Sequence, residues 1–265
     1  MKVMNMIKKS LKKVFIETFE PTMIKNGFLR KDKIFHRIVN GKIVQLLSFY
    51  KYSGSEFTIQ FSIEPLCCDG EYSTFMDDLR VDEVFRDIEP WEYEHQTDGF
   101  VEYMPEALKV TEELLFPLFD LIVDYTNYLE EINNLYPFPL PIFDNSIYMM
   151  NMVLGDYEKS KESKETRINN RISANQRRWG TNNHIDPVTQ AKFEQECEEY
   201  YRIKEAMDSN DREYIDQYIH EQEQKSLRSY VKAFSTPKKY KIFLETGVLP
   251  FEFVLIPECD YSAHN

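Results

Sequence analysis

The clearest pattern of hydrophobic and polar positions in this sequence is a strict alternation from Glu56 to Glu64. Its apolar members are Phe57, Ile59, Phe61 and Ile63, and its polar members are Thr58, Gln60, Ser62 and Glu64. Successive side chains of a β-strand point to opposite faces of the sheet, so the pattern predicts a strand with one buried face. Burying these large side chains would contribute roughly 6–12 kcal/mol, so this face needs a cover.

Two further strands are predicted before this one. Asn40-Gly41 lies between two apolar runs, and this pair tolerates the positive φ angles of a two-residue hairpin turn. We therefore predict antiparallel strands over residues 28–39, 42–51 and 56–64, with a second turn at Ser53-Gly54-Ser55.

An amphipathic helix is predicted over residues 3–19, where apolar side chains recur at helical spacing. The stripe consists of Ile7, Leu11, Val14, Phe15 and Thr18, and the opposite side carries Lys8, Lys9, Lys12 and Lys13. We expect the stripe to cover the sheet, with Pro21 bending or restarting the helix and Asn26-Gly27 ending it. A basic amphipathic helix can also lie on an anionic membrane, but the adjacent strand face favours the cover.

The middle of the chain is acidic, with a short helix predicted over residues 74–85. Trp91, Tyr93 and His95 then alternate with glutamates, which indicates a fourth strand at a sheet edge. From Pro105 to about residue 135 the apolar positions return to helical spacing, and Pro117 should kink or divide that helix.

The segment Tyr136 to Phe143 holds three prolines and cannot be regular helix. The predicted fold is therefore α+β: an antiparallel sheet of three to four strands covered by helices over residues 1–135, a connector at 136–143, and an all-helical subdomain over 144–265. The predicted helices of this subdomain are 145–154, 156–178, 186–207 and 210–233, and the apolar run 251–256 is expected to dock as a strand.

Charge is unevenly spread along the chain, whose net charge is −13. Residues 1–66 hold 12 Lys and Arg against 5 Asp and Glu (+7), residues 67–134 hold 3 against 19 (−16), and residues 135–265 hold 17 against 21 (−4). An acidic field of this kind disfavours nucleic-acid phosphates and favours a basic partner, although many acidic surfaces are simply solvated. Lysines interrupt the N-terminal apolar pattern and no 18-residue apolar run occurs, so we expect a soluble, cytoplasmic protein.

Motifs that carry known chemistry are missing from the sequence. The eight glycines are isolated, so no phosphate loop or dinucleotide fingerprint forms, and His220-Glu221 lacks the second histidine of a zinc helix. Cys67, Cys68, Cys197 and Cys259 have no CxxC spacing and are expected to be reduced. We predict no catalytic residue, metal site or cofactor from these patterns.

The N-terminal half resembles a bacterial family of unknown function, the domain numbered forty-three zero four. The matching residues are Gly27-Phe28, Arg30, Lys31, Phe35-His36-Arg37, the run Val44 to Tyr50, Trp91-Glu92-Tyr93 and Leu115-Phe116-Pro117-Leu118-Phe119. The resemblance covers about Met4 to Leu135, and Leu154-Gly155-Asp156-Tyr157 is similar to a turn in longer members. It implies a small α+β domain in a bacterial cytoplasm, similar in size and acidity to proteins that neutralise toxins, and it implies no catalytic residues.

Three functional hypotheses follow. The first is a non-enzymatic binding protein, immunity-like or inhibitor-like, whose acidic residues meet a basic protein; they are Asp77, Asp78, Asp82, Glu83, Asp87, Glu89, Glu92 and Glu94. The second is an enzyme with a site between sheet and helices that uses His36 or His95. The third is a scaffold of helical hairpins that binds a peptide in an apolar groove within residues 144–235.

Overall fold

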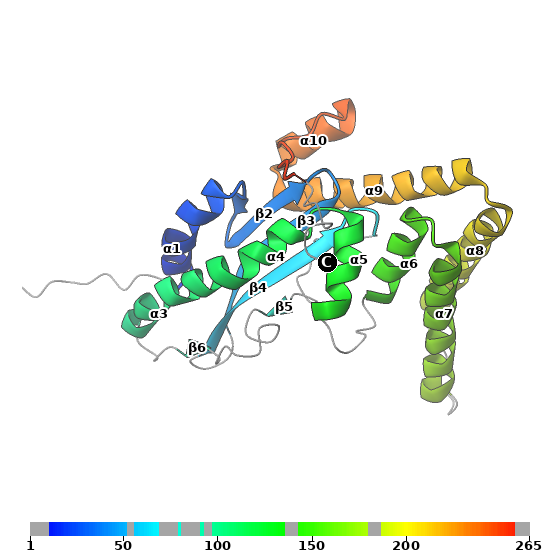
Figure 1. Ribbon diagram of the computed structural model, residues 1–265, viewed down its shortest axis with the longest axis horizontal. Coiled ribbons are helices and arrows are strands. Elements are labelled where there is room, and N and C mark those ends of the chain that lie inside the picture. The colour runs from blue at the N-terminus through cyan, green and yellow to red at the C-terminus, as the bar shows by residue number, and fades with distance from the viewer. Residues whose placement is uncertain are drawn as a thin grey trace, which may run out of the picture. The chain divides into compact units, whose positions relative to one another are not determined.

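The structure is a computed structural model that describes residues 11–51, 56–68, 79–80, 91–92, 97–135, 143–179 and 187–257. Its fold is α+β, as predicted, with an antiparallel sheet and a helical region later in the sequence (Figure 1). The strands are β1 (Leu29–Lys31), β2 (Ile34–Val39), β3 (Ile43–Lys51), β4 (Glu56–Pro65), β5 (Leu79–Arg80) and β6 (Trp91–Glu92). The sheet order is β1-β2-β3-β4-β5, and β6 pairs with β4.

Most helices follow the sequence periodicity, but the helix predicted over residues 74–85 is wrong at Leu79–Arg80, which form β5 and pair with β4. The helices in the described part of the chain are α1 (Leu11–Lys25), α3 (Thr97–Val110), the π-helical turn η1 (Thr111–Leu115), α4 (Phe116–Leu121), α5 (Tyr125–Leu135), α6 (Phe143–Val153), α7 (Tyr157–Trp179), α8 (Pro187–Ser209), α9 (Arg212–Phe234) and α10 (Pro237–Thr246). α10 was not predicted as a helix; Thr236 caps it by accepting a hydrogen bond from the Lys239 backbone N–H.

Contacts divide the chain into two compact units. The sheet unit consists of residues 1–64, 72–127 and 230–265, and the helical unit of residues 65–71 and 128–229. This division differs from the predicted one, which assigned everything after the connector at 136–143 to a helical subdomain. The end of the chain belongs to the sheet unit, where Val254 pairs with Val39 in an isolated parallel bridge. The apolar run 251–256, predicted to dock as a strand, forms this single bridge and no strand.

Two tight turns set the register of the first strands. Asn40 and Gly41 have φ angles of 50° and 67°, which confirms the predicted hairpin between β2 and β3. The single strand predicted over residues 28–39 is wrong, because Asp32 with φ of 59° turns the chain and separates β1 from β2. A lone aspartate without glycine is a weak turn signal, so the turn at Asp32 was not recognised within the strand predicted over residues 28–39. The predicted turn at 53–55 lies outside the described residues.

Helix α1 covers the sheet as predicted. The ring centroid of Phe15 lies 5.7 Å from that of Phe35 in β2 and 5.5 Å from that of Phe49 in β3. The helix continues through Pro21 to Lys25 and then ends where it was predicted to end. Gly27 has φ of 78°, and the Phe28 N–H donates to the Met23 carbonyl at 3.0 Å, which is the hydrogen bond of a Schellman cap.

The helical run from α3 to α4 lies along β4 (Figure 1). The ring centroid of Phe119 is 6.1 Å from that of Phe61, so this run helps to cover the alternating apolar face. Pro117 does not divide the helix, contrary to one form of the prediction. Instead η1 precedes it, and the Phe116 N–H donates to the Thr111 carbonyl at π-helical spacing. Proline offers no N–H and crowds the carbonyl four residues earlier, and the wider turn accommodates both effects.

The sheet is buried on both faces, whereas the alternation predicted one. Thr58 and Ser62, on the polar face of β4, are 0% and 7% exposed, and His36 in β2 is 2% exposed. The ring centroid of His36 lies 4.3 Å from that of Phe234, near the end of α9. The C-terminal segment packs here too, since Phe251 meets Tyr230 edge to face.

A buried arginine joins three elements of the sheet unit. The Arg37 side chain is 5% exposed, and its Nε donates to Gln45 Oε1 at 2.7 Å. Its other nitrogens donate to the Asn26 carbonyl at 2.6 Å and to Asp120 Oδ1 at 3.2 Å, and its guanidinium lies 4.4 Å from the Phe28 ring centroid. Each nitrogen of the guanidinium therefore donates a hydrogen bond, and the Phe28 ring lies against the group.

Gln45 extends the same network to the end of α4. Its Nε2 donates to the Phe119 carbonyl at 2.5 Å and to the Ile122 carbonyl at 3.1 Å. The last carbonyls of a helix have no intrahelical partner, so a buried helix end needs donors of this kind. Gln45 is itself fully buried.

We expect Gln45→Leu to lower the free energy of unfolding by roughly 2–4 kcal/mol, because it leaves two helix-end carbonyls and the Arg37 Nε without partners. Urea denaturation followed by circular dichroism measures this change. Asp120→Asn is the control, because Asp120 is 60% exposed and its replacement should cost less than about 1 kcal/mol. Equal effects of the two substitutions would contradict the role given to Gln45.

Candidate functional site

The acidic residues predicted to bind a partner are only marginally covered by the structure. Asp77, Asp78, Asp82, Glu83, Asp87, Glu89 and Glu94 lie outside the described residues. Glu92 lies in β6, opposite Glu56 of β4, at the edge position that its sequence pattern predicted. The structure therefore neither gathers these residues into one site nor separates them.

The described continuation of this acidic segment forms an exposed helical surface, which we call the acidic helix face. It consists of Tyr103, Glu106, Glu113, Leu114 and Asp120, from α3, η1 and α4. Tyr103 is 41% exposed and Leu114 is 38% exposed. The face thus combines carboxylates with two partly exposed side chains, Tyr103 and Leu114, that could pack against a partner.

His36 is a core residue rather than an active-site base. Its Nδ1 lies 2.6 Å from Tyr230 Oη, and burial, followed by the charge of Lys31, lowers its pKa to about 3. The imidazole is therefore neutral at pH 7. His95, the other histidine of the enzyme hypothesis, lies outside the described residues.

The helical unit contains a polar cavity of about 360 Å³, which we call the helical-unit cavity. Helices α6, α7, α8 and α9 supply most of its wall. Its charged lining residues are Lys164, Arg167, Lys192, Glu196, Glu199 and Lys225, and its amides and phenols are Gln195, Gln222, Tyr148, Tyr200 and Tyr218. The peptide-scaffold hypothesis called for an apolar groove within residues 144–235, whereas this cavity is polar.

The cavity is polar because α7 has almost no apolar inner face. Among residues 157–173, the buried side chains are those of Ser160, Lys164 and Ile168. The sequence periodicity predicted a helix here, but the site was missed because the polar positions of the helix were not considered. The available signal was their spacing, which is that of one helix face.

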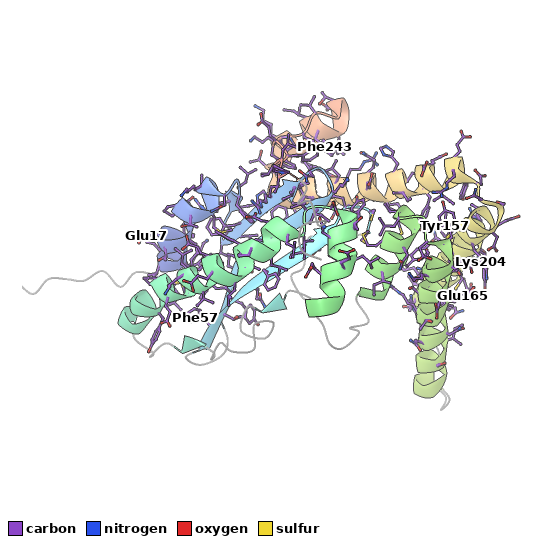
Figure 2. The ribbon with its side chains drawn as sticks, viewed as in Figure 1. Glu17, Phe57, Tyr157, Glu165, Lys204 and Phe243 are labelled. Carbon is purple, nitrogen blue, oxygen red and sulfur yellow. The ribbon has the colours of Figure 1, made fainter. Side chains whose placement is uncertain are left out.

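Ion pairs attach α7 to α8. Glu196 accepts from Lys164 Nζ at 3.0 Å and from Arg171 Nη1 at 2.7 Å, and the Lys164 side chain is 8% exposed. Burial alone would raise the pKa of Glu196, but the neighbouring cations lower it below its ordinary value. Lys204 and Glu165 form a second pair between the same helices (Figure 2).

Tyr148 lies in the cavity wall with its polar atom unused. The residue is 1% exposed, and its hydroxyl has no hydrogen-bond partner. Lys164 Nζ lies 5.2 Å from its ring centroid. Burial, together with the neighbouring Tyr218 phenol, raises the pKa of Tyr148 well above its ordinary value, so the hydroxyl keeps its proton.

Within the described residues, no group of three or more His, Cys, Asp or Glu side chains is placed to hold a metal ion. Cys67, Cys68 and Cys197 are free thiols, as predicted for them, while Cys259 lies outside that part of the chain. None of the helices described has both the length and the apolar character needed to span a membrane.

No protein-family model matches this chain, and the comparisons with curated proteins and with solved structures give no match either. The resemblance of residues 4–135 to the bacterial family of unknown function therefore stays a prediction. The acidic helix face and the helical-unit cavity are therefore the features of the structure from which a function can be inferred.

We expect His36 to make the protein less stable in acid. Below its ordinary pKa of 6.5 the unfolded chain takes up a proton here, whereas the folded protein does so only near pH 3, so stability falls as the pH drops between these values. The free energy of unfolding of the wild type should fall, relative to that of His36→Leu, by about 1.4 kcal/mol per pH unit between pH 6 and 4. Urea titrations at each pH measure the difference. Parallel slopes for the two proteins would contradict a neutral buried imidazole.

Proposed function

We propose that this chain is a non-enzymatic binding protein that recognises a basic protein partner, in the manner of an inhibitor or an immunity protein. The observation that carries the proposal is the concentration of acidic residues in one segment. Residues 67–134 hold 19 Asp and Glu against 3 Lys and Arg, so this segment has a charge of −16 within a chain of −13. A field of one sign attracts partners of the opposite sign and speeds their association.

The acidic helix face supports the proposal from the described part of this segment. Tyr103 and Leu114 are exposed to 41% and 38% on the same helical run as its carboxylates, of which Glu113 pairs with Lys109 and Asp120 with Arg37. Apolar anchors supply most of the affinity at a protein interface, while surrounding charges set the association rate and the choice of partner. Localisation in a bacterial cytoplasm would fit this function, and it rests on the sequence resemblance alone.

The competing hypotheses gain less support from the structure. The enzyme hypothesis used His36 or His95. The His36 side chain is buried against Tyr230 and Phe234, and His95 lies outside the described residues. The peptide scaffold depended on an apolar groove, and the helical-unit cavity is lined mainly by charged and amide side chains.

We expect affinity capture from the native host at low salt to retain a basic protein on the wild-type chain, and to lose it on Glu106→Gln/Glu113→Gln. The association rate constant of the purified pair should fall about tenfold when NaCl is raised from about 50 to 300 mM, because exposed charges are screened. Stopped-flow fluorescence measures this rate.

The matched control is Glu198→Gln/Glu213→Gln, which removes the same charge from exposed positions in the helical unit. It should leave capture and rate nearly unchanged. Capture of no basic protein, or an association rate that is indifferent to salt, would count against the proposed function.

A further inference from the structure

We propose that the helical-unit cavity is a binding site for a small phosphate monoester. This inference is independent of the proposed function, because the charged residues of the cavity lie in the helical unit and outside the acidic segment that carries that function. Its volume of about 360 Å³ is larger than an isolated anion needs and lies within the range of small-ligand pockets.

The charges that line the cavity favour an anion. Three lysines and one arginine face two glutamates there, although the whole chain is acidic. Glu196 is already neutralised by Lys164 and Arg171. No carboxylate of the described residues lies within ion-pair distance of Arg167 or Lys192, so the positive charge of the cavity exceeds what its own glutamates balance.

The cations come from different helices, which suits a group with several oxygens. Arg167 lies on α7, Lys192 on α8 and Lys225 on α9. A phosphate monoester carries up to two charges and three terminal oxygens, and it accepts from several donors at once. A carboxylate has two oxygens and one charge, so it would balance less of the positive charge that these helices supply.

The amide beside Lys225 is held in place by its neighbours. Gln222 Nε2 donates to Glu199 Oε1 at 3.4 Å, and Gln222 Oε1 accepts from Lys225 Nζ at 3.3 Å. This chain of hydrogen bonds occupies Glu199 and places the Lys225 ammonium at the cavity wall. It is a second case in which a lining carboxylate already has a partner.

The Tyr148 hydroxyl is the observation that points to a ligand independently of charge. It is buried and retains its proton, and it makes no hydrogen bond of ordinary geometry, although the Tyr218 phenol lies near enough to raise its pKa. A buried hydroxyl without a partner costs roughly 1–3 kcal/mol, so such groups need an explanation. A ligand oxygen would supply the missing acceptor, and the Tyr148 and Tyr200 rings provide apolar surface for the organic part of the ligand.

The test is isothermal titration calorimetry of the full chain with phenyl phosphate, at constant ionic strength set with NaCl. We expect saturable binding of phenyl phosphate at one site and no binding of phenol. Lys192→Gln/Lys225→Gln should weaken the binding of phenyl phosphate at least about tenfold, because two charge-assisted contacts are lost. Lys238→Gln/Lys239→Gln removes the same charge from exposed positions on α10 and should leave the affinity unchanged.

Tyr148→Phe separates a ligand contact from a structural role. Without ligand, it should unfold at the same temperature as the wild type or at a higher one, because it removes an unpartnered hydroxyl. With phenyl phosphate, it should bind about fivefold more weakly than the wild type. Unchanged affinity in this variant would overturn the assignment of the hydroxyl.

Three further outcomes would overturn the site as a whole. These are no saturation up to about 10 mM phenyl phosphate, equal losses from the two lysine pairs, and binding of a phosphotyrosine peptide more than tenfold tighter than phenyl phosphate. The last result would make the natural ligand a protein segment rather than a small molecule.

Discussion

The sheet unit depends on one buried cation, the Arg37 guanidinium, each of whose three nitrogens donates a hydrogen bond to a protein group. Arg37 is 5% exposed, and a guanidinium removed from water costs several kcal/mol unless every donor finds an acceptor. Its acceptors include the Asn26 carbonyl just beyond α1, and through Gln45 the network reaches the carbonyls at the end of α4. These helix ends carry partial negative charge, so one cation orients both helices over the sheet. The chain turn after α1, the pairing of β2 with β3 and the end of α4 must therefore all be in place for this network to form.

Local signals predicted much of this unit. The turn at Asn40-Gly41, the alternation in β4 and the covering helix each rest on residues close together in the sequence, and the structure confirms all three. The Asp32 turn and the burial of Arg37 could not be read in the same way. A polar residue in an alternating strand is predicted to be exposed to solvent unless a buried partner is known. The partners of Arg37 include Asp120, which is distant in the sequence.

The acidic helix face and the helical-unit cavity also differ in whether the sequence alone could locate them. Counting charges located the acidic segment directly, because net charge is a property of composition, and the acidic helix face is part of it. The helical-unit cavity could not be located, because its wall combines side chains from four helices that the pattern analysis treated one at a time. The spacing of Ser160, Lys164 and Ile168 holds the signal, but it is read correctly only when the opposite helices are known.

The interior of the helical unit contains polar groups that destabilise the unliganded protein. Apolar side chains in place of a buried charge and its partner often leave a protein as stable or more stable, so packing alone gives no reason to bury Lys164 beside the half-buried Glu196. An unpartnered hydroxyl on Tyr148 adds a cost without any return in the unliganded protein. Charge and an unused donor around one cavity are costs that a bound anion would offset together, since it would accept from the hydroxyl and balance the excess cations. An empty cavity lined by apolar side chains would differ, because binding an anion there would not stabilise the protein.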